Sequence, residues 1–183
     1  MASQGGNIRY VINSSGKLVE ITGPWDEFYA GNSEEALNSS KVLGTNIFDC
    51  MADSTTSYVY ENFHKQLLDG KVEQINFGCR CDSTNLSRST EIKLKLVPGT
   101  NNIAYESKIT KVRFMHNLKE LPEEFADAAI LMCSICKSFR LESEPKGWTP
   151  VEDNFEIMLV HDNVSHTVCP GCLEDFSRRG YLE

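Results

Sequence analysis

The chain has 183 residues and a mass of 20.6 kDa, enough for one ordinary domain, or a domain with a small appendage, to bury a hydrophobic core. Its formal net charge is −8 and its sequence pI is about 5.1, so no global positive field favours nucleic acid or anionic lipid as a partner. Hydrophobic residues make up 40% and charged residues 24%, close to globular averages, which argues against wholesale disorder.

The sequence shows no sign of export or of a membrane span. Residues 1–10 lack the basic cluster followed by an apolar core that a secretory signal needs. The longest apolar run, Ala128–Cys133, is far shorter than the roughly 20 residues of a membrane helix. Seven cysteines in such a chain indicate reduced thiols, because the cytosol does not maintain ordinary disulfides. We therefore expect a soluble cytoplasmic protein with no membrane partner.

The N-terminal part predicts a hairpin followed by short helices. Strands are expected over 8–12 and 18–21, because residues 13–16 (Asn-Ser-Ser-Gly) supply the backbone angles of a tight turn. Pro24 suits a first helical position and begins a short helix that carries Trp25. A single helical turn is expected over 46–51.

A longer helix and three strands follow. The spacing of Val59, Phe63 and Leu67 predicts a helix from Thr55 to a stop at Asp69–Gly70. Beyond it the hydrophobic period changes to two, as half-buried antiparallel strands require. Strands are expected over 75–81, 91–96 and 104–114, with a loop over 82–89 and a turn over 98–102.

The last third has a different pattern. A boundary is expected over 118–122, followed by a helix from Glu123 that carries Phe125, Ala128, Ala129 and Met132. Helical spacing returns from Val151 through Phe155, Met158 and Leu159, and residues 170–178 predict a last short helix. The fold class is therefore α+β, with one domain over 8–117 and a second unit over 123–183.

Two Cys-x-x-Cys claws give the strongest chemical signal. They are Cys133 with Cys136, and Cys169 with Cys172. Two such pairs fill a tetrahedron around one ion at a metal–sulfur distance of about 2.3 Å. With Zn²⁺ and four thiolates the site has no free position for water, so it is structural and not hydrolytic. So small a unit buries little apolar surface, and metal affinity becomes folding energy; we expect removal of the ion to unfold this tail first.

Other readings of the claws stay open. A rubredoxin-like iron centre also uses paired claws, although glycine after the second cysteine is typical there and Lys137 and Leu173 occupy those places. Reduced core cysteines that bind no ion, or reversible dithiols, are further alternatives. His166 precedes Cys169 by three residues, and as a ligand it would give a site of three cysteines and one histidine. A helix starting near Cys172 would place its positive end beside a thiolate.

Three further features have ordinary structural explanations. Cys79 and Cys81 alternate on one strand face, where an apolar wall is the common role. His64, beside Phe63, is of a type that can ligate haem iron, but a satisfied or exposed histidine is the simpler interpretation. The loop residues Arg80, Asp82 and Arg88 favour an internal ion pair over a carboxylate-binding site.

No catalytic signature is present in the sequence. Glu34–Glu35 and Glu123–Glu124 are sequential, so on a helix they point about 100° apart and form no acid/base dyad. We find no nucleophile elbow, phosphate-cradling glycine loop, Walker lysine or kinase signature. The sequence therefore predicts a protein that is not an enzyme.

The chain resembles a PAS domain over roughly Ile8–Phe114. The segments that carry this resemblance are Tyr10–Gly16, Trp25–Phe28, Val42–Phe48, the helix residues Tyr60–Phe63 leading to Gly70, and Phe77–Ser83. With Ile130–Cys136, Trp148–Glu152 and His166–Cys172 downstream, the whole is similar to small bacterial PAS proteins with a C-terminal paired-cysteine segment.

This resemblance implies a sensory or protein-interaction role, a homodimer, a signalling protein partner, and zinc at Cys133, Cys136, Cys169 and Cys172. The flavin-photosensor motif is missing, because Asp49–Cys50 is followed by Met51 and Ala52. The resemblance to PAS domains also implies a five-stranded antiparallel sheet with helices on one side. These elements would surround a small cavity for an unidentified small-molecule ligand. The cavity candidates are Phe48, Tyr60, Phe63, Phe77, Ile92 and Leu94.

Overall fold

The computed structural model describes residues 7–30, 38–51, 53–82, 86–114, 128–143, 147–151 and 164–183. In that part of the chain, no helix is long and apolar enough to cross a membrane. The predicted boundary over 118–122 lies outside the described residues, as does most of the helix expected from Val151 onward.

Five antiparallel strands form the larger sheet, in the order β2-β1-β5-β4-β3. Their bounds are β1 Ile8–Ile12, β2 Leu18–Thr22, β3 Ile75–Arg80, β4 Leu86–Leu96 and β5 Ile103–Phe114. This arrangement, with helices inserted between β2 and β3, is the α+β architecture that the sequence predicts. One boundary was wrong: the expected loop over 82–89 is shorter, because β4 already begins at Leu86 and pairs with β5 as far as Phe114.

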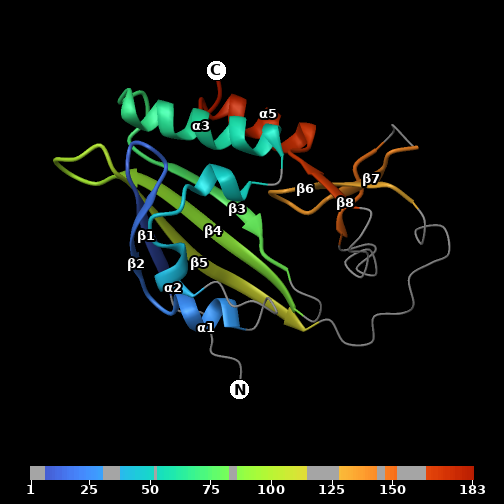
Figure 1. Cartoon of the computed structure of the whole chain (residues 1–183). Coiled ribbons are helices and arrows are strands. Elements are labelled where there is room, and N and C mark those ends of the chain that lie inside the picture. Colours follow the sequence, from blue (N-terminus) through green and yellow to red (C-terminus); the bar gives the residue numbers. More distant parts are fainter. Residues whose placement is uncertain are drawn as a thin grey trace.

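Short helices and one long helix connect β2 to β3, and Figure 1 shows the helices on one face of the sheet. They are α1 Trp25–Ala30, α2 Ser39–Val42, the 3-10 helix η1 Ile47–Cys50 and α3 Ser54–Leu68. The sequence predicted all of these except α2. Asp53 caps α3 by accepting hydrogen bonds from the Thr56 backbone N–H (2.8 Å) and hydroxyl (2.6 Å).

Glycine is required where the first hairpin meets η1. Gly16 has a φ of +77°, and a Cβ there would lie 2.7 Å from Asn46 Oδ1 and 2.8 Å from the Phe48 ring. The Gly16 carbonyl accepts a hydrogen bond from Ile47 N–H at 3.0 Å. The hairpin turn therefore fixes η1 against the sheet.

The core lies between the sheet and α3. Phe63 and Leu67 of α3 and Ile75 and Leu94 of the sheet are at most 1% exposed. The C-terminal segment contributes to the same core, since Phe176 and Tyr181 are 2% and 7% exposed and belong to the same cluster. Phe176 lies in α5 (Pro170–Arg178), which runs beside α3 in Figure 1.

The cysteine-rich part forms a second, three-stranded sheet in the order β7-β6-β8. Its strands are β6 Ile130–Cys133, β7 Phe139–Leu141 and β8 Val164–Thr167; β6 and β8 are parallel. The helix predicted from Glu123 was therefore wrong where the chain is described, because Ala128–Ala129 are not helical and Met132 lies in β6. A short apolar run does not distinguish a helix from a strand buried on both faces.

Candidate metal centre

The four claw sulfurs converge. All four Sγ atoms lie within 4.8 Å of one another. The Cys136–Cys169 Sγ pair is 3.7 Å apart and the Cys133–Cys172 pair 3.9 Å apart. A regular tetrahedron with metal–sulfur bonds of about 2.3 Å has edges of roughly 3.8 Å, so the two closest contacts already have the spacing of ligands around one ion. The donor set fits a thiophilic metal ion.

The first claw is a tight turn at the end of β6. Cys133 N–H donates to the Ser138 carbonyl (2.8 Å), and Lys137 N–H donates to the Cys133 carbonyl (3.1 Å). Lys137 has a φ of 62° and is the one non-glycine residue with positive φ in the described part of the chain. It therefore adopts the backbone conformation for which glycine is typical at this place. Its side chain does not prevent the turn, so the lack of glycine here does not distinguish zinc from iron.

The second claw opens α5, as the sequence predicts for residues 170–178. Cys169 is the N-cap residue, Pro170 follows at a first helical position, and Cys172 lies in the first turn. Cys169 N–H donates to Cys133 Sγ at 3.3 Å, which links the two claws directly. The positive end of the helix faces a cluster that bears negative charge when the thiols ionise.

Hydrogen bonds among the four thiols favour ionisation of some of them and oppose ionisation of others. Hydrogen bonds from the Cys133, Cys169 and Cys172 thiols lower the pKa of Cys136 below its ordinary value. The pKa of Cys172 is raised, first by its contacts with Cys133, Cys136 and Cys169 and then by burial. The cluster therefore stabilises some thiolates at the expense of others, and binding of a divalent ion would release the remaining protons.

The two claws differ little in their exposure to solvent. Cys133 and Cys169 are buried, whereas Cys136 and Cys172 are half-buried. Ser138 lies with its hydroxyl 3.2 Å from Cys136 Sγ. A crevice of about 640 Å³ is lined by Cys136, Ser138 and residues of β3 including Cys79. The four-cysteine cluster is thus reached from this crevice at Cys136.

His166 lies outside the ligand cluster. It is in β8, opposite Met132 of β6, and the group of converging ligand atoms in the described residues consists of the four cysteines. Burial and then the nearby Lys137 ammonium lower the pKa of His166. The donor set is therefore four cysteine sulfurs, and His166 is not needed to complete it.

The first claw makes contacts with the larger sheet domain that the sequence analysis did not predict. Within the first claw, Ser134 Oγ donates to Asp53 Oδ2 at 3.2 Å, and the Ile135 carbonyl accepts from Arg80 N–H at 2.9 Å. The position of Asp53 before a helix is a typical N-cap signal. Nothing in the local sequence, however, indicates that the claw lies against it.

The predicted ion pair is confirmed. Arg80 Nη2 lies 2.7 Å from Asp82 Oδ2, and the two side chains are 9% and 0% exposed. Asp82 Oδ1 accepts from Arg88 N–H at 2.9 Å, so Arg88 contacts the same carboxylate through its backbone. Cys79 is half-buried, and burial raises its pKa to about 12, which fits an unreactive thiol on an apolar face.

The six residues predicted to line a ligand cavity lie in or near the hydrophobic core. Phe63, Phe77 and Leu94 are core residues, Tyr60 and Ile92 pack against them, and Phe48 contacts His64 with ring centroids 5.3 Å apart. Of these six candidates, Phe77 alone also lines one of the two hollows described in this section. A small-molecule ligand at this place stays a prediction.

His64 is a buried residue next to this core, and its ring nitrogen has a hydrogen-bond partner. Its Nε2 forms a hydrogen bond with the Tyr105 hydroxyl, whose ring stacks on Tyr10 with centroids 4.7 Å apart. Burial lowers the pKa of His64 to about 4, so the ring is neutral at pH 7. This is the satisfied histidine that the sequence favours over a haem ligand.

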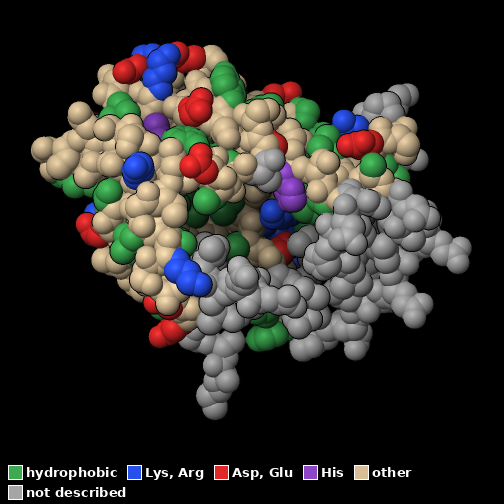
Figure 2. Space-filling model, viewed as in Figure 1, with side chains coloured by type: hydrophobic (Ala, Val, Ile, Leu, Met, Phe, Trp, Pro, Cys, Tyr) green, Lys and Arg blue, Asp and Glu red, His purple; other side chains and the backbone are tan. Residues whose placement is uncertain are grey.

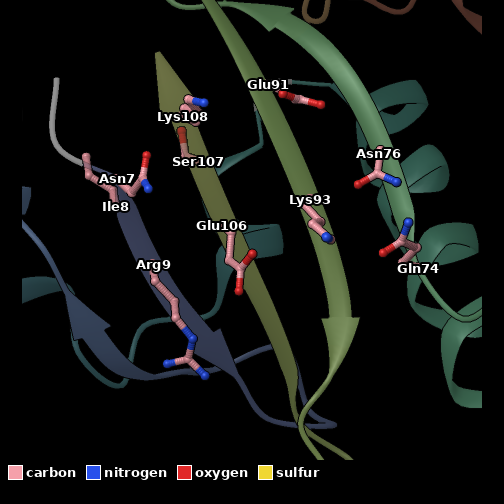
Figure 3. Close-up of a pocket in the computed structure, with 10 residues that line it drawn as sticks. All are labelled: Asn7, Ile8, Arg9, Gln74, Asn76, Glu91, Lys93, Glu106, Ser107 and Lys108. Atoms are coloured by element: carbon pink, nitrogen blue, oxygen red, sulfur yellow. The ribbon is translucent and has the colours of Figure 1, made fainter. Parts of the chain in front are cut away.

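A larger hollow, of about 690 Å³, lies on the opposite face of the five-stranded sheet (Figure 3). Its charged lining residues are Arg9, Glu91, Lys93, Glu106 and Lys108. A hydrogen bond with the Lys95 side chain, followed by burial and by the like charge of Lys95, lowers the pKa of Lys93. This face is polar and of mixed sign, which explains why apolar and polar residues alternate in β3 and in the second half of β4.

Comparison with known proteins finds similarity to solved structures only. No family model matches the chain, and no curated protein matches it. A crystal structure of the C-terminal domain of a Streptococcus mutans protein is 15% identical, with a TM-score of 0.42, and the match covers 57% of this chain and 76% of that one. A sensory box sensor histidine kinase from Vibrio cholerae is 8% identical, with a TM-score of 0.40 and coverage of 60% and 86%.

Proposed function

We propose that the protein is a non-enzymatic signal-sensing or protein-interaction module with a structural zinc ion at its four claw cysteines. The observation that carries this proposal is the convergence of four sulfurs from two distant claws within 4.8 Å. Four thiolates complete a tetrahedral coordination shell and leave no position for a reactive water. The site therefore suits holding the chain together and does not suit hydrolysis.

The wider proposal includes a homodimer that signals through a protein partner in the cytoplasm, and a small-molecule ligand on the inner side of the sheet. The Cys-x-x-Cys spacing suits metal ligation more than a disulfide framework, which supports a reducing compartment. A nucleic-acid partner does not fit, since the net charge is −8 and Figure 2 shows Lys and Arg side chains scattered among Asp and Glu on this face of the described residues.

Native mass spectrometry of protein purified without chelator tests the metal proposal and reports subunit number and retained small molecules together. We expect one zinc ion per chain. The variant Cys136→Ser should lose most of the bound zinc, whereas Cys50→Ser, at an exposed cysteine in η1, should retain it. A chain that is metal-free after purification in the presence of zinc would overturn the proposal.

A redox protein is the second candidate, and the backbone of Lys137 favours keeping it. Because Lys137 takes up the positive φ that glycine usually supplies, the first claw has the turn that a rubredoxin-like iron centre needs. The half-buried Cys136 and Cys172 are also open to reversible oxidation. A red visible spectrum, or a thiol count that falls reversibly by four on mild oxidation, would favour this function over the first.

A further inference from the structure

The first claw makes two contacts with the larger sheet domain. Ser134 Oγ donates to Asp53 Oδ2, and this same carboxylate caps the first turn of α3 through Thr56. Ile135 is 3% exposed, and its carbonyl accepts from Arg80 N–H at the end of β3. The two residues between the ligands of this claw thus bind the start of α3 and the end of β3.

Helix α5, which begins at the second claw, and the residues after it contact the same two elements, α3 and β3. Phe176 in α5 packs its ring against Phe63 of α3 and Phe77 of β3, with centroids 5.1 Å and 5.6 Å apart. Beyond α5, the Tyr181 hydroxyl accepts from Asn76 N–H near the start of β3 at 3.3 Å. Both claws therefore hold both α3 and β3, at different points along each element.

The chain end extends this contact along α3. Glu183 forms ion pairs with Lys65 and Lys71, and its backbone carbonyl accepts from the Tyr58 hydroxyl at 3.0 Å. Glu183 N–H donates to Asn62 Oδ1 at 3.4 Å. The segment that starts at Cys169 is thus bound to α3 over much of its length.

We infer that the four-cysteine centre is a regulatory clamp, in which metal occupancy controls how firmly α3 and β3 are held together. The inference rests on the proposed metal site and assigns it a role beyond structural support: the metal ion is itself the signal. With the ion bound, the claws form one unit and their contacts with α3 and β3 are made together. Without it, four thiols crowd within 4.8 Å with no cation to join them, and each claw must hold its contacts alone.

The clamp predicts where the effect of metal removal appears. The Thr56 and Arg80 amides report the two contacts of the first claw, because each donates a hydrogen bond at the points described above. The Val97 amide is a control within the same chain, since it bonds to the Asn102 carbonyl (2.9 Å) in the β4–β5 turn and has no claw contact. Local opening of this kind is measured by amide hydrogen exchange.

The experiment compares hydrogen exchange of the full chain with zinc bound, after chelation, and after zinc is restored. We expect protection of the Thr56 and Arg80 amides to fall by about tenfold or more on chelation and to return with zinc, while Val97 is unchanged. In Ser134→Ala, zinc should still bind with unchanged stoichiometry and affinity, but the Thr56 amide should lose its dependence on zinc and Arg80 should retain it. Ser165→Ala, at an exposed serine of β8, should behave like the unmodified protein.

The outcomes separate this inference from the proposed function. If zinc binds and leaves reversibly while exchange at Thr56 and Arg80 stays constant, the clamp is wrong and the metal centre stands. If chelation lowers the protection of the Val97 amide as strongly as that of the Thr56 and Arg80 amides, the ion only holds the fold together. The clamp is then also wrong. If no zinc binds at all, the proposed function itself fails.

Discussion

At the scale of single residues, several side chains in this protein have a role that depends on a partner far away in the sequence. Ser134 donates a hydrogen bond to Asp53, which precedes it by 81 residues. His64 is satisfied by Tyr105, 41 residues away. The types of these residues are visible in the sequence, but their partners are set by the packing of the sheet on α3.

His64 should make folding stability depend on pH. Its pKa of about 4 in the folded protein lies below the ordinary 6.5, so between these values the unfolded chain binds more protons and stability falls as pH falls. At pH 4.5 the loss relative to pH 7.5 should be about 2 to 3 kcal/mol. Urea unfolding of the unmodified protein and of His64→Gln measures it, since the variant removes this titration and leaves the other groups in place. Equal pH dependence in the two proteins would show that His64 is not buried as a neutral group.

At the scale of secondary structure, local signals predict an element well where its own residues decide the outcome. The helix stop at Gly70 and the helix at Pro170 depend on caps and on proline, and both occur where the sequence places them. Strand β6 depends on pairing with β8, in which Ile130 lies opposite Val164, whereas the apolar run of β6 by itself predicts a helix. The sequence predicts the two claws because the spacing of two cysteines within a claw is a local feature. It does not predict their contacts with α3 and β3, because these join residues far apart in the sequence.

The N-cap of α3 offers a test at this scale. Asp53→Ala removes the acceptor for the Thr56 N–H and hydroxyl, and should cost about 1 to 2 kcal/mol of unfolding free energy. It also removes the acceptor of Ser134, so the penalty should shrink when it is measured in the Ser134→Ala background. Asp49→Ala, at an exposed aspartate of η1, is the matched control and should cost little. Additive effects of Asp53→Ala and Ser134→Ala would mean that the two side chains do not interact.

At the scale of the whole molecule, the cysteine-rich segment completes the core of the larger sheet domain. Phe176, Tyr181 and Ile135 share one hydrophobic cluster with Phe63 and Phe77. Truncation of a buried phenylalanine such as Phe176 to alanine typically costs about 3 to 5 kcal/mol. A segment that contributes so much to a shared core should not unfold as an independent tail, which differs from the expectation drawn from the sequence.

The two tryptophans of the chain make this measurable in the metal-loaded protein. Trp25 lies in α1 and contacts Tyr10 of β1, whereas Trp148 lies in the cysteine-rich part beside Arg140 of β7. The variants Trp25→Phe and Trp148→Phe leave one fluorescent reporter in each region. Since the shared core links the regions, each remaining tryptophan should report the same urea midpoint, and circular dichroism should match it in each variant. An earlier transition at Trp148 than at Trp25, with circular dichroism falling in two steps, would show that the cysteine-rich part unfolds by itself and that the shared cluster contributes little to stability.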